Sequence, residues 1–156
     1  MARSKSGRTV MVMLFFLYSG IVLCMLFGRS THNSGADYWH SVWENINIIP
    51  LKTTIDFIRD LFDPSHFGQF RHACINLFGN IIVFVPLGIF LPCIWERQRR
   101  FCVLFCTASV IILAVECLQL FTLRGICDVD DFLLNLLGIS VGFALYLWSR
   151  RLRKSE

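Results

Sequence analysis

The chain has 156 residues, of which 55% are hydrophobic, and its mean hydropathy is +0.59. This composition excludes an ordinary soluble domain and predicts a single membrane-embedded unit, residues 1–156, of the all-α class. The formal net charge is +4, but the basic residues are placed between apolar segments as topology signals, so we expect no nucleic-acid partner.

Four apolar stretches are long enough to cross a hydrocarbon core of about 30 Å, which takes roughly 20 helical residues. Because a backbone in lipid must satisfy its own hydrogen bonds, each stretch is predicted to be a helix. The first follows Arg3, Lys5 and Arg8, as a signal peptide would, but its apolar run exceeds the usual ~7–15 residues, so we expect a retained span. The predicted spans are Thr9–Phe27, Ile75–Trp95, Phe101–Phe121 and Phe132–Trp148.

The distribution of Lys and Arg indicates the topology. These residues gather before the first span, between the second and third spans, and after the fourth, whereas the other two connections mix them with many acids. Loops that stay in the cytoplasm keep Lys and Arg, so we predict a multi-pass protein of the cell membrane with both termini cytoplasmic. The long connection Gly28–Cys74 would then lie outside.

This outer connection contains a predicted extended segment and a predicted short helix. Asn47–Pro50 is expected to be extended, because a proline disfavours helix in the residue before it. Thr53 or Thr54 is the expected N-cap of a helix that reaches about Phe62. The apolar stripe of this helix is typical of an interfacial helix on the membrane surface. A loop that simply covers the outer end of the bundle is an equally good interpretation.

Seven cysteines raise the question of disulfides. Cys74 and Cys127 lie near span ends on the predicted outer side, where a disulfide could form in an oxidising compartment. The others fall within apolar stretches, where a thiol usually acts as a small hydrophobic group. The pairing of Cys74 with Cys127 stays open, and no Cys or His spacing typical of zinc is present in the sequence.

Acid and amide side chains recur near the outer ends of three predicted spans. A charge at the centre of a membrane helix costs roughly 2.5–3.5 kcal/mol, so such groups usually line a site or meet a partner. Asn80, Glu116 and Asn135 each lie roughly 7 Å inside their span at about 1.5 Å per residue. We therefore predict one polar layer at the outer leaflet, which contains Asn76, Asn80, Glu116, Gln119, Arg124, Asp128, Asp131 and Asn135.

The fourth span carries polar residues and glycines on one face. Asp131 and Asn135 are followed at helical spacing by Gly138 and Gly142, and the two glycines form the GxxxG pattern that lets helix backbones approach closely. The polar face of this span is therefore predicted to be its packing face, which favours a converging site over scattered polar groups.

Each polar group also has a structural interpretation. Asp128 and Asp131 surround the predicted start of the fourth span, where a carboxylate caps free N–H groups and complements the helix dipole. Amides such as Asn80 and Asn135 often hold helices together. Glu116 is harder to explain in this way, because a buried carboxylate needs a cation such as Arg124 or Arg71 to offset its desolvation.

The layer is compatible with several kinds of chemistry. Glu116 could act as a general base, while Arg124 stabilises a developing anion or holds a lipid phosphate. The catalytic candidates are Glu116, Asp128 and Asp131, and the substrate-binding candidates are Asn76, Asn80, Gln119, Arg124 and Asn135. Together with Asp130 the acids could hold Mg²⁺ or Ca²⁺, but their spacing matches no EF-hand loop, so we predict no cofactor and keep a divalent cation only as a weak alternative.

Four motifs resemble the VanZ-like membrane protein family, in order and spacing, across about residues 45–145. The first is Asn47–Ile48–Ile49–Pro50, and the second runs from Asn76 through Gly79–Asn80 to Pro86–Leu87–Gly88. The third is Val115–Glu116–Cys117–Leu118–Gln119, and the last is Asp128–Val129–Asp130–Asp131 with Asn135 and Gly138. The sequence departs from the family pattern at Ile139, where family members often have a second glycine.

The resemblance implies a polytopic protein of the bacterial envelope, linked to lowered susceptibility to teicoplanin and similar lipid-tailed antibiotics, and it supplies no mechanism. Our first hypothesis is a protein whose polar layer acts on an outer-leaflet partner, namely a membrane lipid, a lipid-linked wall precursor or a lipid-tailed antibiotic. The second is an intramembrane enzyme that modifies such a substrate with Glu116 as base. The third is a non-catalytic accessory protein whose polar layer holds helices together. The sequence leaves the oligomeric state undetermined.

Overall fold

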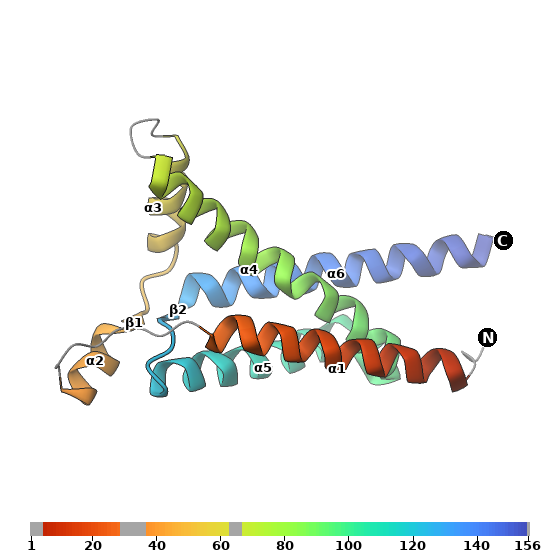
Figure 1. The fold of residues 1–156 in the computed structure, drawn as a ribbon. Coiled ribbons are helices and arrows are strands. Elements are labelled where there is room, and N and C mark those ends of the chain that lie inside the picture. The colour runs from red at the N-terminus through yellow and green to blue at the C-terminus, as the bar shows by residue number, and fades with distance from the viewer. Residues whose placement is uncertain (1–4, 29–36, 63–66, 156) are drawn as a thin grey trace.

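The structure is a computed structural model, and it describes residues 5–28, 37–62 and 67–155. Within these residues, four helices are long and apolar enough to cross a membrane, which confirms the all-α class and the predicted number of spans. The long helices are α1 (Lys5–Phe27), α4 (Phe67–Ile94), α5 (Phe101–Phe121) and α6 (Val129–Ser155). Helix α1 begins and α6 ends at the same end of the bundle (Figure 1).

Three helices extend beyond their predicted spans. Helix α1 begins at Lys5 rather than Thr9, and α4 begins at Phe67 rather than near Ile75. Helix α6 runs from Val129 to Ser155 rather than from Phe132 to Trp148. The apolar run determines where a helix can sit in lipid, but backbone hydrogen bonds continue through polar residues on either side of that run. A turn of 3-10 helix, Glu96–Arg99, connects α4 to α5.

Helices α4 and α6 form the tightest contact of the bundle, and they cross near their middles (Figure 1). A Cβ added to Gly138 would collide with the carbonyl oxygen of Ile81, and one added to Gly142 would collide with that of Val85. Gly88 on α4 approaches α6 equally closely. Ile139, at the position where the family often has glycine, is 1% exposed and belongs to the hydrophobic core. The prediction that the glycine face of the fourth span is its packing face is confirmed.

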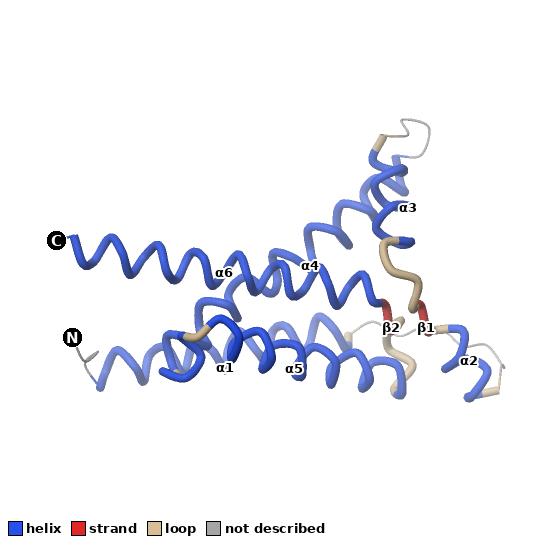
Figure 2. Tube along the Cα trace, turned by 180° about the vertical axis from the view of Figure 1, so that it is seen from behind, coloured by secondary structure: helices blue, strands red, loops and turns tan. Residues whose placement is uncertain are grey.

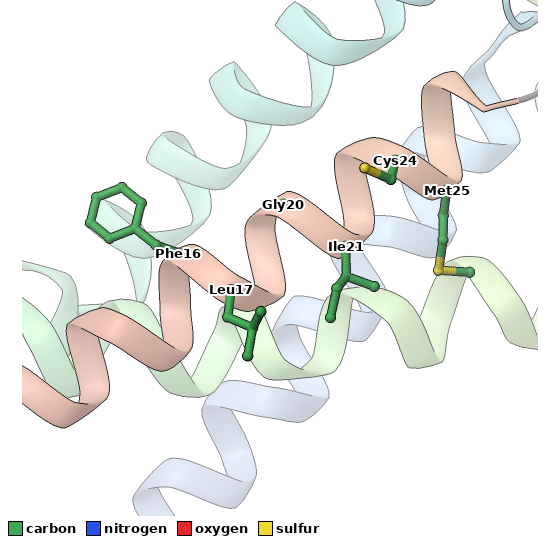
Figure 3. Close-up of a pocket in the computed structure, with 6 residues that line it drawn as sticks. All are labelled: Phe16, Leu17, Gly20, Ile21, Cys24 and Met25. Carbon is green, nitrogen blue, oxygen red and sulfur yellow. The ribbon is translucent and has the colours of Figure 1, made fainter.

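Helix α1 lies at the edge of the bundle. The hydroxyl of Tyr18 donates a 2.6 Å hydrogen bond to the carbonyl of Val83 on α4, and the rings of Phe15 and Phe90 meet edge to face. The other side of α1 bears a shallow hollow of about 550 Å³, lined by Phe16, Leu17, Gly20, Ile21, Cys24 and Met25 (Figure 3). All six residues belong to α1 and nearly all are apolar, so in a bilayer this side faces acyl chains.

The described part of the connection between α1 and α4 contacts the start of α6 and the residues just before it. It contains α2 (Tyr38–Glu44), the short strand β1 (Ile46–Asn47) and α3 (Lys52–Leu61). Strand β1 pairs in parallel with β2 (Cys127–Asp128), so that Ile46 faces Cys127 and Asn47 faces Asp128 (Figure 2). The predicted extended segment is confirmed at Asn47, and the predicted helix is confirmed with its end at Leu61.

Candidate functional site

The polar residues gather at the end of the bundle where α4 and α6 begin and α5 ends, and Asp128 connects them to the loop. Its Oδ2 accepts hydrogen bonds from the Asn47 amide at 3.1 Å and from the Thr53 hydroxyl at 2.7 Å. Its Oδ1 accepts the backbone N–H of Asp130 at 2.8 Å. Asp128 is buried, and each of its oxygens has a protein donor. Its geometry is therefore that of an anchor for the loop.

Asp130 caps helix α3 from a distant part of the chain. Its carboxylate accepts the backbone N–H of Leu51 at 2.5 Å and that of Thr54 at 2.8 Å, and its side chain is only 1% exposed. Leu51 has a φ of 64°, a backbone conformation that residues other than glycine rarely adopt. The hydrogen bond from its N–H to the Asp130 carboxylate helps to hold this conformation. The prediction that Thr53 or Thr54 caps the helix is wrong, because the Thr53 hydroxyl donates to Asp128 and the free N–H groups are taken by Asp130.

Asn80 and Asp131 link α4 to α6. The Asn80 amide donates to Asp131 Oδ1 at 2.5 Å and to Asn76 Oδ1 at 3.2 Å. All three side chains are partly buried. The predicted convergence of the second and fourth spans is therefore confirmed at these residues.

Glu116 on α5 is a further carboxyl group at this end of the bundle, beside Asp128 and Asp131. The side chain is 5% exposed, and its Oε2 has no hydrogen-bond partner among the described residues. The backbone of Asp128 and the carboxyl groups of Asp131 and Asp128 lie close enough to act electrostatically on the Glu116 carboxyl. We call Glu116, Asp128 and Asp131, with Asn76 and Asn80, the polar cluster. It combines three carboxyl groups with amides at one depth, an arrangement that favours a hydrogen-bond donor or a cation.

Arg124 and Gln119 lie apart from the polar cluster, at the C-terminus of α1. The Gln119 amide donates to the Leu26 carbonyl at 3.1 Å, and the Arg124 guanidinium donates to the Phe27 carbonyl. Both side chains thereby satisfy carbonyl groups that a helix end leaves free. The hydrogen bond described for Arg124 goes to α1, so the expectation that it partners Glu116 is not met. The side chain of Arg71, the other expected partner, lies outside the described residues.

Asn135 on α6 is the least exposed of the predicted site residues. It is 4% exposed, and its Oδ1 has no hydrogen-bond partner in the described part of the chain. An unpartnered buried amide oxygen costs about 1–3 kcal/mol, so this position is compatible with a donor that the protein itself does not supply.

No group of three or more His, Cys, Asp and Glu side chains that could hold a metal ion is found within residues 5–28, 37–62 and 67–155. Cys74 and Cys127, whose pairing the sequence left open, are both free thiols.

Sequence reasoning missed the part that Asn47 and Thr53 play beside Asp128. Both residues belong to the long connection, and their partners lie 81 and 75 positions away. A usable signal was present, because Asn47 belongs to one of the motifs on which the family resemblance rests, and an amide in a short extended segment is suited to pair with a neighbouring strand.

The four spans and the buried acids at one end of the bundle define a polytopic α-helical membrane protein with an intramembrane polar site. Residues 15–150 match the model of the VanZ/LLP1 family. Since the match covers most of the chain, the protein belongs to the VanZ/LLP1 family. Searches among curated proteins and solved structures found no significant match.

Proposed function

We propose that this protein is a bacterial envelope protein that lowers susceptibility to teicoplanin-type, lipid-tailed glycopeptides through its polar cluster. In this proposal both termini are cytoplasmic, and the polar cluster faces the outer leaflet. The partner is a lipid-tailed molecule, which is the antibiotic itself, a membrane lipid or a lipid-linked wall precursor. Family membership supports the link to glycopeptides.

The positions of the basic residues support the orientation. Arg97, Arg99 and Arg100 are exposed on the connection between α4 and α5, and Arg150 and Arg151 are exposed near the end of α6. These groups lie at the end of the bundle opposite the polar cluster. Because arginine is retained on the cytoplasmic side, the polar cluster is expected outside.

The observation that carries the proposal is the Oε2 of Glu116, which has no hydrogen-bond partner among the described residues and lies beside two further carboxyl groups. A bundle that used these acids only for cohesion would be expected to provide donors for them. A bound headgroup that offers hydroxyl, amide or ammonium donors would supply them instead, while its lipid tail stays among the acyl chains around the bundle. This arrangement favours binding of a donor-bearing amphiphile.

Intramembrane catalysis is the alternative that the same atom supports. Glu116 would act as a general base on a lipid or a lipid-linked precursor, with Asp131 orienting the substrate. Asp128 contributes little to this alternative, because its two oxygens are already occupied by donors from the protein. A purely cohesive polar cluster in an accessory protein is the third possibility.

Replacement of Glu116 by Gln tests the proposal, with Glu44→Gln as the matched control because that carboxylate is exposed on α2. Cells that express each variant at equal protein level are tested against teicoplanin and against a glycopeptide without a lipid tail. The binding proposal predicts that Glu116→Gln abolishes the protection against teicoplanin and that Glu44→Gln leaves it intact. A charge-assisted hydrogen bond contributes about 1.5–3 kcal/mol, so teicoplanin affinity of the purified protein should fall roughly tenfold or more.

Protection that survives Glu116→Gln at normal protein level would overturn both the binding and the catalytic roles of Glu116. Mass spectrometry of lipids and wall precursors then separates these two roles. A modified species that depends on the protein and disappears with Glu116→Gln would favour the enzyme, whereas an unchanged profile favours binding. If Glu116→Gln and Asn80→Ala lower only the amount of folded protein, with protection per molecule unaltered, the polar cluster has a cohesive role.

A further inference from the structure

The first turn of α3 is hydrogen-bonded to the start of α6, and the helix also packs beside α4. The Thr53 hydroxyl donates to Asp128, and the backbone N–H of Thr54 donates to Asp130 at 2.8 Å. A helix at the surface of a water-soluble domain usually packs its apolar face inward, while its polar face meets water. The hydrogen bond from Thr53 instead leaves the apolar face of α3 turned away from the polar cluster.

Three apolar side chains form this outward face. At about 3.6 residues per turn, Ile55 and Ile58 lie on the side of α3 opposite Thr53, and Phe62 follows at the same spacing in the turn just after the helix ends at Leu61. Ile55 is 51% exposed, Ile58 is 42% exposed and Phe62 is 83% exposed. The exposed charged residues of the helix, Lys52, Asp56 and Arg59, lie outside this stripe. The helix is strongly amphipathic, and these three apolar side chains are exposed.

The apolar surface continues into the preceding segment. Trp43 at the end of α2 is 73% exposed, Ile48 is 71% exposed and Ile49 is 56% exposed. A soluble protein rarely exposes so many large apolar side chains together, and tryptophan is enriched where a membrane protein crosses the membrane–water boundary.

The direction of α3 fits a position along the membrane surface. Figures 1 and 2 show α3 running across the direction of α1, α5 and α6, beside the first turns of α4. A bilayer that surrounds the four spans therefore meets α3 along its length. On the adjoining helix α4, Ile75 and Phe78 are also about half exposed, so the membrane span beside α3 has exposed apolar side chains as well.

We propose that α3, with Trp43 and the pair Ile48–Ile49, lies in the interfacial layer of the bilayer, and that Ile55, Ile58 and Phe62 contact acyl chains. The position of α3 beside the membrane span α4, whose own apolar side chains are exposed, is the reason for a lipid occupant rather than a protein. The hydrogen bond from the Thr53 hydroxyl to Asp128 sets the rotation of the helix that turns this face toward lipid, and the bond from the Thr54 N–H to Asp130 holds its first turn. This inference does not depend on the proposed link to glycopeptides.

Site-specific photocrosslinking tests the proposal. A benzophenone amino acid is placed singly at Ile55, Ile58 or Phe62 in the full chain, reconstituted in vesicles of phosphatidylethanolamine and phosphatidylglycerol. The matched controls carry the same residue at Asp56 or Arg59, on the charged side of the same helix. After irradiation, mass spectrometry of the intact protein should show lipid adducts several-fold more abundant from the three apolar positions than from the two controls.

Equal amounts of lipid adduct from both sides of α3 would overturn the proposal. Crosslinks from Ile55, Ile58 and Phe62 to a second copy of the chain or to another protein would also overturn it. A second measurement guards against variants that fold poorly. In a chain whose four native tryptophans are replaced by phenylalanine, tryptophan introduced by Phe62→Trp should be quenched by lipids brominated on the acyl chain more strongly than tryptophan introduced by Asp56→Trp, at matched thermal stability. Equal quenching of the two would also overturn the proposal.

Discussion

Asn80 on α4 donates a hydrogen bond of 2.5 Å to Asp131 on α6, and this contact connects two helices across 51 positions of the chain. The same amide donates to Asn76, so it orients one acceptor on its own helix and one on the neighbouring helix. Asn80 directly precedes Ile81, whose backbone lies against Gly138 of α6. Polar pairing and close backbone packing therefore act at the same contact between α4 and α6.

Exchange of the two side chains tests this pairing. Asn80→Asp alone places a carboxylate against Asp131 and removes the donor, so we expect a lower thermal midpoint in detergent, equivalent to about 1–3 kcal/mol. Asp131→Asn alone should cost less, because an amide still offers an acceptor. The double change Asn80→Asp with Asp131→Asn restores one amide and one carboxyl group and should recover most of the loss. A double variant as unstable as the sum of the two single variants would show that the residues are not coupled.

Gly142→Ala should separate α4 from α6. The added methyl group would collide with the Val85 carbonyl oxygen and crowd Gly88, and backbone atoms cannot move aside as a flexible side chain can. We expect a loss of about 1–3 kcal/mol, seen as a lower midpoint of thermal unfolding. Gly79→Ala is the matched control, since a Cβ there has no neighbour within 4 Å. Alanine at this position should leave stability unchanged or raise it slightly, because it favours helix. Equal losses in the two variants would contradict the packing role of Gly142.

Asp130→Asn should loosen the start of α3. An amide offers one oxygen in place of two, so the N–H groups of Leu51 and Thr54 cannot both keep their acceptor. We expect a loss of about 1–2 kcal/mol and faster hydrogen exchange at these two amides, measured by mass spectrometry of the protein in lipid nanodiscs. Asp56→Asn, an exposed change on the same helix, is the control. Unchanged exchange at Leu51 and Thr54 in Asp130→Asn would contradict the capping role.

Cys127 provides a prediction about pH. Burial raises the pKa of its thiol, and the charges of Glu116, Cys117 and Asp128 raise it further. Because only the thiolate reacts, less of the reactive form is present near neutral pH than in a free thiol, and the deficit shrinks as the pH rises through the shifted pKa. In a variant that keeps Cys127 alone, alkylation by iodoacetamide should therefore be slower than for a small free thiol and should reach half its limiting rate at higher pH. Asp128→Asn should move the profile toward lower pH. A profile that coincides with that of the free thiol would contradict this account.

The sequence by itself determined the features that depend on local pattern. Apolar stretches of sufficient length gave the number of spans, because a backbone in lipid must bond within its own helix. The glycine spacing gave the packing face of α6, since small residues at helical intervals fall on one side. The depths of Asn80 and Glu116 followed from counting residues along a helix, and both residues do lie in the polar cluster.

Only the tertiary structure decided which polar groups meet. Gln119 and Arg124 lie near Glu116 in the sequence, yet both turn to the end of α1, where free carbonyl groups need donors. Asp130 caps α3 by accepting hydrogen bonds from the N–H groups of Leu51 and Thr54, which lie 79 and 76 positions earlier in the chain. It therefore has the capping role that the local pattern assigned to a threonine. The reason is physical: a helix fixes the position of a side chain along its own axis, whereas the choice among distant donors and acceptors depends on how whole segments pack.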